Sequence, residues 1–525
     1  MNLPRSAGLL LHPSSLPSPY GVGDFGPGAF QLADQLAAAG ISIWQVLPLG
    51  PTGFGNSPYQ SFSAFAGEPI LISPDLLVED GLLNSADVRD TPEFCERSVD
   101  YEKVREWKLA RLLTAFENFA CHRTGEELHS FQQFCADQAN WLDDYALFMV
   151  LRSHFDDETW TRWDRPFALR NPGALAKARE KYAAEIECQK FWQFLFYKQW
   201  LNLRRHCSGK GIRIVGDIPI YVSHDSADVW AQPTQFQLDE SGNSLLVSGV
   251  PPDYFSETGQ LWGNPIYNWQ EMERSGFHWW IQRFRGTFHL YDALRIDHFR
   301  GFEAFWEVPA TEKTAVNGRW VKAPGEKLFR TVTAALGEME IIAENLGVIT
   351  PEVEALRMKF NYPGMAILQF AFGIEGNAAN YRPHNLERQV VAYTGTHDND
   401  TTVGWWNSSG GDSTRSEEDI RKEKEFVEQY LGDSNESIEW RMMRALFGSV
   451  AQIAVVPMQD ILGLGSESRM NRPGVATGNW SWRMLPNEFS QDLIQRLRVL
   501  METYDRVPQP PKEEEPDNEP KEAAV

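Results

Sequence analysis

Five short apolar segments of the sequence run directly into side chains that could do chemistry. They read IRIVGDIPIY, with Asp217; ALRIDHFRG, with Arg295 and Asp297; EIIAENLG, with Glu344; VVAYTGTHDND, with His397 and Asp398; and AVVPMQD, with Gln459 and Asp460. Taken singly, each acidic residue is also typical of a helix N-cap or a turn. A carboxylate beside a buried strand is costly to desolvate unless it is paired or used, and several carboxylates at one place repel one another. Together they favour chemistry over capping.

Two of these carboxyl groups have the local surroundings that glycosidic bond cleavage requires. That reaction uses one ionised carboxylate at the reacting carbon and one protonated carboxyl group that donates to the departing oxygen. Arg295 precedes Asp297 by two residues, so both side chains lie on one face of a strand and the guanidinium favours the charged carboxylate. Glu344 follows the apolar residues IIA, which favour its protonated form. This indicates Asp297 as nucleophile and Glu344 as acid/base, and the residues alone leave the reverse assignment open.

Two histidines adjoin these carboxylates in the sequence. His298 and His397 are predicted to donate hydrogen bonds to sugar hydroxyls, and a purely structural role is the alternative for each. The letters HDND could also indicate metal ligands, but adjacent residues of an extended chain point to opposite faces and the sequence has no DxDxDG loop. We therefore predict neither a metal nor a cofactor.

The elements that must position these residues are eight apolar runs, each followed by a polar segment and then by sequence of helical period. They cover residues 8–11, 43–47, 212–216, 293–296, 340–343, 365–370, 390–394 and 453–457. Such runs are typical of buried parallel strands in βα units, and eight of them predict an α/β fold, a closed (β/α)8 TIM barrel. A first helix is predicted to begin at Pro27 and to end at Gly40. Catalytic side chains of such barrels lie at the C-terminal ends of the strands.

The domain organisation follows from the sequence between these runs. We predict a catalytic barrel over residues 1–505, with a mainly helical insertion at about 73–182 and an irregular loop over the barrel mouth at about 233–265. Residues 506–525 are rich in Pro and acidic residues and lack apolar periodicity, which predicts a disordered tail.

Composition narrows the partners. A formal net charge of −23 argues against a nucleic acid, whose phosphates are neutralised by Lys and Arg, although the acidity also serves solubility. Nineteen Trp, 31 Phe and 15 Tyr exceed the needs of a core and indicate stacking surfaces for flat ligands. The five cysteines form no CxxC pair, and no apolar stretch approaches a signal peptide or a membrane span. We expect a cytoplasmic protein without membrane contact, as a monomer or a weak homo-oligomer.

Several motifs closely resemble one family over residues 9–482. They are HPSSLPSPYGVGDFG, LPLGPTGFGNSPYQS, GDIPIYV, GVPPDYFSETGQLWGNPIYNW, LRIDHFRG, AENLG, GTHDNDT and RMNRPG. They resemble the amylomaltase, or disproportionating-enzyme, family of 4-α-glucanotransferases, glycoside hydrolase family 77. The resemblance implies transfer of α-1,4-glucan segments to the 4-hydroxyl of glucose or a maltooligosaccharide by a retaining double displacement without a cofactor. Retention predicts carboxyl groups about 5 to 5.5 Å apart.

The resemblance also implies roles for individual residues. Asp297 corresponds to the nucleophile, Glu344 to the general acid/base and Asp398 to the residue that holds the donor sugar and stabilises the transition state. The expected substrate contacts are Tyr59, Asp217, Tyr254, Phe255, Trp262, Arg295, His298, Phe370, His397 and Asn471. Phe370 is expected to end its strand. Phe54 stands where many relatives have Tyr, and the chain begins almost at its first strand, without the N-terminal extension of some longer relatives.

Two other functions stay open at this point. An α-glucan hydrolase would use the same carboxyl groups, because composition does not show whether the loops exclude water. A carbohydrate-binding protein without activity would share the fold, since fold alone does not prove catalysis. All three acidic positions are filled, which favours an enzyme.

Overall fold

The barrel is built from the eight apolar runs of the sequence. In the computed structural model, which describes residues 4–122, 125–252, 256–373, 376–409 and 416–507, they form eight parallel strands in the order β10-β11-β12-β1-β2-β3-β6-β9. The strands are β1 (Ser6–Leu10), β2 (Ile43–Gln45), β3 (Arg213–Ile218), β6 (Ala293–Ile296), β9 (Ile341–Ala343), β10 (Gly364–Ile367), β11 (Val390–Tyr393) and β12 (Ile453–Pro457). The sheet closes where the amide of Ala343 donates to the carbonyl of Pro363 at 2.9 Å. The predicted TIM barrel is confirmed.

Side chains along the strands alternate between the barrel interior and the surrounding helices. Val215, Ile342 and Val455 belong to the buried cluster inside the barrel. Their neighbours Ile214 and Ile341 belong to the large outer core between strands and helices. Because side chains fill the centre, the barrel is a packed core, and functional groups are confined to the strand ends.

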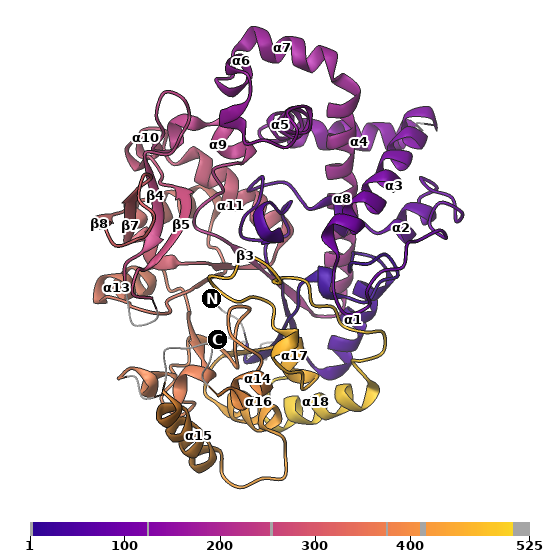
Figure 1. Ribbon diagram of the computed structural model, residues 1–525. Helices are drawn as coiled ribbons and strands as arrows, with labels where there is room; N and C mark the ends of the chain where they lie inside the picture. Colours follow the sequence, from indigo (N-terminus) through magenta and orange to yellow (C-terminus); the bar gives the residue numbers. More distant parts are fainter. Residues whose placement is uncertain (1–3, 123–124, 253–255, 374–375, 410–415, 508–525) are drawn as a thin grey trace, which may run out of the picture.

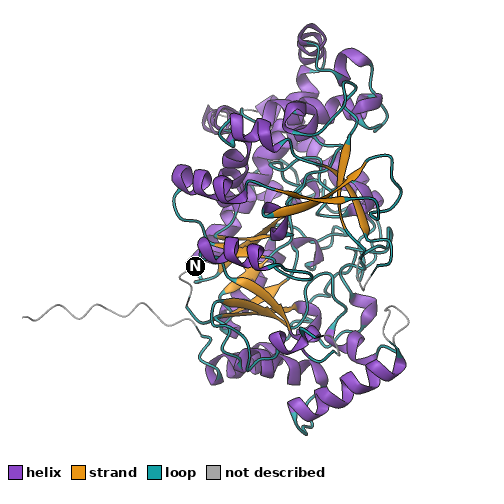
Figure 2. Cartoon of the chain, turned by 90° about the vertical axis from the view of Figure 1, so that its left-hand side faces the viewer, coloured by secondary structure: helices purple, strands orange, loops and turns teal. Residues whose placement is uncertain are grey.

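Helices surround the strands, as the two perpendicular views show (Figures 1 and 2). Helix α1 (Pro27–Ala39) begins with Pro27, and Gly40 ends it with a left-handed φ of 77°, as predicted. The other helices outside the helical insertion are α9 (Ala227–Ala231), α10 (Trp269–Arg274), α11 (His278–Leu290), α12 (Gly325–Leu336), α13 (Pro351–Lys359), α14 (Thr402–Asn407), α15 (Glu417–Leu431), α16 (Ile438–Gly448), α17 (Met458–Ile461) and α18 (Gln491–Thr503).

A group of helices lies between β2 and β3 and forms the upper part of the molecule in Figure 1. It comprises α2 (Pro74–Glu79), α3 (Tyr101–His122), α4 (Gly125–Asp137), α5 (Leu142–His154), α6 (Arg165–Ala168), α7 (Pro172–Lys181) and α8 (Ala183–Gly209). Helix α8 has 27 residues, about 40 Å at 1.5 Å per residue, and it brings the chain back to β3.

The segment 233–265, predicted as an irregular loop, contains two strands. These are β4 (Leu246–Val250) and β5 (Gln260–Pro265), which join β7 (Ala304–Pro309) and β8 (Arg319–Lys322) in an antiparallel sheet of order β5-β4-β7-β8. We call it the small sheet. The prediction was wrong because β4 and β5 pair with each other in a Gly- and Pro-rich stretch that gives little sign of strands, and β4 also pairs with β7, which lies after β6.

Phe370 does not end its strand, contrary to the prediction. Strand β10 ends at Ile367, and Phe370 lies in the following 3-10 helix η7 (Leu368–Ala371). The chain turns there because Gln369 is held on both sides. Its amide donates to the Thr394 carbonyl (3.2 Å) and its side chain donates to the Asp400 carbonyl (2.9 Å).

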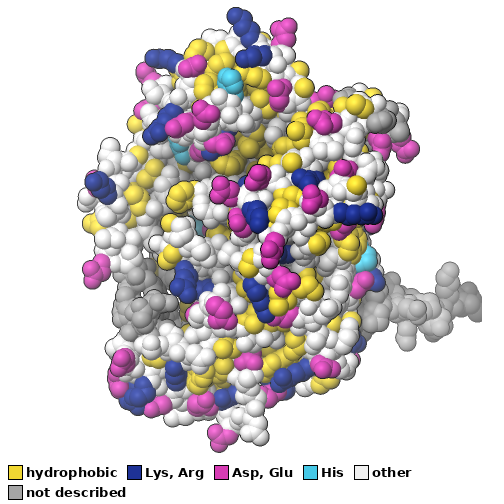
Figure 3. Space-filling model, turned by 45° about the vertical axis from the view of Figure 1, so that its right-hand side comes forward, with side chains coloured by type: hydrophobic (Ala, Val, Ile, Leu, Met, Phe, Trp, Pro, Cys, Tyr) yellow, Lys and Arg dark blue, Asp and Glu magenta, His cyan; other side chains and the backbone are white. Residues whose placement is uncertain are grey.

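Basic and acidic side chains are interspersed over the face of the molecule shown in Figure 3. The net charge of −23 is therefore not gathered into one block on this face.

Of the helices in the described part of the chain, none is long and apolar enough to cross a membrane.

One buried ion pair ties the helical insertion to the barrel. The Lys108 ammonium of α3 contacts the Asp24 carboxylate at 2.9 Å and also donates to the carbonyls of Ile70 (2.8 Å) and Ile72 (3.1 Å). Both side chains of the pair are at least 95% buried. The cost of removing one partner of such a pair is mostly that of leaving the other charge buried alone.

We expect Lys108→Met to lower the free energy of unfolding by about 3 to 5 kcal/mol, because Asp24 loses its counter-ion. Lys198→Met is the control, because Lys198 and Asp80 form a partly exposed pair at 2.7 Å, which is worth about 1 kcal/mol or less. Denaturant unfolding of the two variants measures the difference. Equal losses would contradict a special role for the Lys108 pair.

Candidate active site

One guanidinium joins two carboxylates at the ends of neighbouring strands. Arg295 and Asp217 are directly opposite in the register of β6 and β3. The two guanidinium nitrogens Nη1 and Nη2 of Arg295 contact Asp217 Oδ2 at 2.7 Å and Asp297 Oδ1 at 2.9 Å. The side chains of Arg295 and Asp217 are buried, whereas that of Asp297 is 31% exposed. Asp297 is therefore the carboxylate of this group that a ligand can reach.

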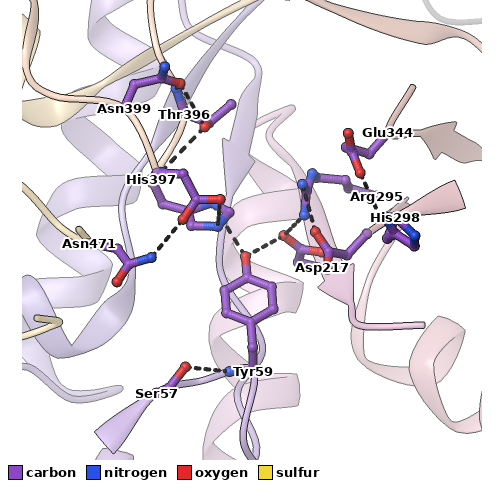
Figure 4. Close-up of polar contacts among 12 residues, drawn as sticks. Ser57, Tyr59, Asp217, Arg295, His298, Glu344, Thr396, His397, Asn399 and Asn471 are labelled. Atoms are coloured by element: carbon purple, nitrogen blue, oxygen red, sulfur yellow. Dashed lines mark hydrogen bonds and ion pairs between the residues drawn. The ribbon is translucent and has the colours of Figure 1, made fainter. Parts of the chain in front are cut away.

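Tyr59 connects this group to a second one around His397, as Figure 4 shows. Its hydroxyl donates to Asp217 Oδ2 at 2.8 Å and lies 3.4 Å from His397 Nδ1. The two rings are stacked with centroids 4.9 Å apart. Trp480, which the sequence reasoning missed, packs 5.9 Å from Tyr59 and 5.8 Å from His397 between ring centroids. Its only sequence signal is an aromatic residue shortly after Asn471.

Asp398 is held by two side chains, those of His397 and Asn471. Its Oδ2 lies 3.4 Å from His397 Nε2, and its Oδ1 accepts a hydrogen bond of 2.7 Å from the Asn471 amide. The side chain of Asp398 is 48% exposed while that of His397 is 5% exposed. His397 and Asn471 thus orient the Asp398 carboxylate, and its exposed part is accessible to a ligand.

Glu344 follows β9 and is oriented by the backbone. Its Oε2 accepts from the amide of His298 at 2.7 Å and its Oε1 accepts from the amide of Leu346 at 2.8 Å. The amide of Glu344 itself donates to the Ile296 carbonyl at 3.1 Å. His298 itself adopts a left-handed conformation with φ of 51°. The half-buried carboxyl group therefore sits between the loops that follow β6 and β9.

Burial and neighbouring charges separate the protonation states of these groups. The pKa of Glu344 is raised to about 7, mainly by burial; Asp297 also raises it, while Arg295 and the two backbone amides lower it. Burial also raises the pKa of Asp217, against the effect of Arg295. Although burial opposes its charge, Arg295 has a pKa well above its ordinary value because of Asp217 and Asp297. Near neutral pH, Glu344 can therefore carry a proton beside a charged guanidinium and its carboxylate.

The His397 and Asp398 pair behaves in the opposite way. Burial alone would lower the pKa of His397 and raise that of Asp398, but their mutual attraction outweighs it. The pKa of His397 is raised, and that of Asp398 is well below its ordinary value, with Asn471 contributing. The exposed carboxylate of Asp398 is thus held in its charged form.

Together these groups offer a proton donor and a charged carboxylate at one place. Such a division between two carboxyl groups is the one used in substitution at a glycosidic carbon. Among the described residues, no three His, Cys, Asp or Glu side chains are arranged to hold a metal ion. The absence of a cofactor stays a prediction.

The other predicted contacts lie on different sides of this centre. Trp262 of β5 packs edge-on against the His298 ring, with centroids 4.7 Å apart, and burial lowers the pKa of His298 to about 4. Phe370 of η7 is 37% exposed and packs edge-on against Tyr381 at 5.7 Å. Tyr254 and Phe255 lie outside the described residues.

Asp460 shows that not every strand-end carboxylate belongs to the site. It is buried and accepts hydrogen bonds from the hydroxyls of Thr394 (2.5 Å) and Thr402 (2.8 Å) and from the Thr402 amide (2.7 Å). It therefore holds the first residue of α14 from the neighbouring helix α17, while Thr401 is the N-cap of α14.

Comparisons with known proteins agree on one family. Residues 11–488 match the family model described as 4-alpha-glucanotransferase. The chain is 50% identical over 515 residues to the 4-alpha-glucanotransferase of Thermus thermophilus, which covers 97% of this chain and 100% of the relative. It is 49% identical over 510 residues to that of Synechocystis sp., with 96% and 98% covered. Among solved structures, an amylomaltase from Streptococcus agalactiae in complex with acarbose has a TM-score of 0.91 at 38% identity and covers 96% of this chain and 100% of its own.

We predict that Glu344 titrates with a pKa of about 7 and that Asp297→Asn lowers this value, because a negative neighbour disfavours a second negative charge. Carbon-13 NMR of protein labelled at the Glu side-chain carboxyl group measures the titration, and Glu344→Gln assigns the signal. Asp143→Asn, an exposed substitution in α5, should leave the value unchanged. A pKa of Glu344 that stays the same or rises in Asp297→Asn would contradict the assigned coupling.

Proposed function

The chain belongs to the 4-alpha-glucanotransferase family, and on that premise we propose how its strand-end carboxyl groups carry out the reaction. The enzyme moves segments of α-1,4-glucans from one chain to another. We propose that the acceptor group is the 4-hydroxyl of glucose or of a maltooligosaccharide. A monomeric or weakly associated state and a cytoplasmic location stay predictions from the sequence.

In the first step, Asp297 is the nucleophile and Glu344 is the acid. An oxygen of the Asp297 carboxylate forms a bond to the anomeric carbon, and the bond from that carbon to the glycosidic oxygen breaks. Glu344 gives its proton to the departing oxygen, so that the reducing-end fragment leaves as a neutral alcohol. This step needs Glu344 protonated, and its pKa of about 7 meets that condition up to neutral pH.

In the second step, the same two groups act in reverse. Glu344, now ionised, takes the proton of the acceptor 4-hydroxyl while that oxygen bonds to the anomeric carbon. The bond from the carbon to Asp297 breaks, and the carboxylate returns to its contact with Arg295. Two inversions at one carbon restore the α linkage, and no electrons are gained or lost.

Asp398 is proposed to hold the donor sugar and to stabilise positive charge at the anomeric carbon. The observation that supports this is its exposed carboxylate, kept charged by His397 and oriented by Asn471. Hydrogen bonds to sugar hydroxyls are stronger when the acceptor is ionised. Tyr59 would line the same sugar from the strand side, and the buried Asp217 and Arg295 would act on it through their contacts with Tyr59 and Asp297.

Trp262 and Phe370 are proposed to border the glucan groove. Neither ring is fully buried, and exposed aromatic surface of this kind stacks on sugar rings. Tyr254 and Phe255 complete the predicted set. The single observation that carries the whole proposal is the Asp297 carboxylate held on Arg295 next to a protonatable Glu344.

We expect the purified protein to convert maltotriose into glucose and a ladder of longer maltooligosaccharides. The ladder forms because a sugar hydroxyl, rather than water, accepts the glycosyl group. Chromatography of the products measures it. Shortening of maltotriose without longer products would show a hydrolase instead.

The same assay tests the nucleophile. Asp297→Asn should lower the rate of ladder formation on the order of 10⁴-fold or more, since catalytic groups that act as a unit are lost together. Glucan binding, measured by calorimetry, should persist, and Asp143→Asn should keep the wild-type rate. Wild-type rates in Asp297→Asn would overturn the assignment of the nucleophile. If the wild-type protein bound glucans but formed no products, it would be a binding protein instead of an enzyme.

A further inference from the structure

Glu344 depends on two backbone amides that belong to different loops. The His298 amide follows β6, and the Leu346 amide follows β9. Each donates to one carboxyl oxygen, so the orientation of the group changes if the loops separate. The bond from Leu346 therefore depends on the contacts that hold its loop in place.

Leu346 packs against the barrel interior and Ile349 against the outer core, but the two residues between them have little packing of their own. Gly347 has a left-handed φ of 83°, which only glycine adopts without strain, and the side chain of Val348 is 69% exposed. On its other side the loop is anchored through Asn345, whose side chain donates to Glu354 at 2.7 Å and accepts from the Met365 amide at 2.8 Å. The backbone from Leu346 to Val348 is therefore open to a further contact that holds it in place.

Arg300 supplies that contact from the 3-10 helix η6 (Phe299–Phe302), directly after His298. Its Nη1 donates to the carbonyl of Val348. Its guanidinium carbon lies 3.9 Å from the centroid of the Trp320 ring. Arg300 is 9% exposed, so this arrangement is largely shielded from water. One planar side chain thus joins the loop after β6, the loop after β9 and strand β8.

The small sheet gives this contact a rigid base. Trp320 is opposite Trp306 in the register of β8 and β7, and their rings pack edge to face with centroids 5.3 Å apart. The Trp306 indole donates to the Ala315 carbonyl at 2.9 Å. Glu303, which follows η6, pairs with Lys322 of β8 and accepts the Ala323 amide at its carbonyl (2.9 Å). The end of η6 and strand β8 therefore move as one body.

We propose that Arg300 is a positioning residue for Glu344: it clips the loop 345–349 to the small sheet and so keeps the Leu346 amide on the carboxyl group. This inference rests on the proposed role of Glu344 as acid and base. It assigns the small sheet a task in catalysis, in addition to carrying Trp262 at the groove.

The expected effect has a defined sign. A hydrogen bond to the charged form of a carboxyl group lowers its pKa, so weakening the Leu346 bond raises the pKa of Glu344. The charged neighbours of Glu344 are Arg295 and Asp297, and the Arg295 guanidinium pairs with Asp217 and Asp297 rather than reaching toward Arg300. The local charges of Arg300 are Glu303 and Lys322. The route from Arg300 to Glu344 is therefore the loop backbone.

The experiment compares Arg300→Gln and Arg300→Lys with wild type in the full chain. Both variants lose the planar group that stacks on Trp320 and reaches Val348. We expect the alkaline limb of the kcat/KM profile to move up by about one pH unit and kcat at the optimum to fall roughly tenfold or more through misorientation. Arg496→Lys is the matched control, because Arg496 of α18 also stacks on an indole, with its guanidinium carbon 3.7 Å from the centroid of the Trp440 ring. This substitution should leave both quantities unchanged.

The outcomes separate this inference from the proposed function. If carbon-13 NMR shows an unchanged pKa of Glu344 in folded Arg300→Gln, the positioning role is overturned. A wild-type kcat/KM profile in Arg300→Lys also overturns it, because the positive charge at position 300 would then be sufficient without the guanidinium. A shifted titration with an unmoved activity limb supports the clip but refutes Glu344 as the acid. Trp320→Leu, which keeps Arg300 and removes only its stacking partner, should shift both in the same direction by a smaller amount.

Discussion

Two carboxylates share one buried guanidinium, and the rest of the site depends on this arrangement. Burying Arg295 without partners would be very costly, and the register of β3 and β6 places Asp217 where it compensates that charge. With one arm thus fixed in the strand layer, the other arm holds Asp297 at the strand end. Tyr59 extends the same bond network to His397 and thereby to the second exposed carboxylate. The strand geometry alone thus sets the position of the nucleophile.

Burial, more than the neighbouring charges, accounts for the proton on Glu344. Arg295 and Asp297 act on its pKa in opposite directions, with Arg295 lowering it and Asp297 raising it. The nucleophile contacts the guanidinium directly, whereas the acid accepts hydrogen bonds from two neutral amides. These different contacts separate the roles of two chemically similar groups. Their exchange, which the sequence left open, is disfavoured by these contacts.

The strands could be predicted from the sequence because buried parallel strands have continuous apolar runs, and all eight were found. The pairing of Asp217 with Arg295 could not, since it depends on which strands are neighbours and on their register. Strands β4 and β5 were taken for a loop because their stretch is rich in Gly and Pro, and the pairing of β4 with β7 again depends on long-range register. Asp460 has the same local sequence signal as the site residues, yet it is buried in hydrogen bonds to Thr394 and Thr402. Local pattern locates strand ends, and only the assembled barrel shows which of them meet.

The central claim is that Asp297 forms a covalent bond to the transferred sugar, and trapping that bond tests it most directly. In Glu344→Gln, a maltosyl fluoride donor should still react, because fluoride leaves without a proton donor, while the missing base slows the second step. Mass spectrometry of the digested protein should then find a maltosyl group on the peptide that contains Asp297. A maltosyl group on a peptide containing Asp398 or Asp217, or fluoride release without any labelled peptide, would contradict the account.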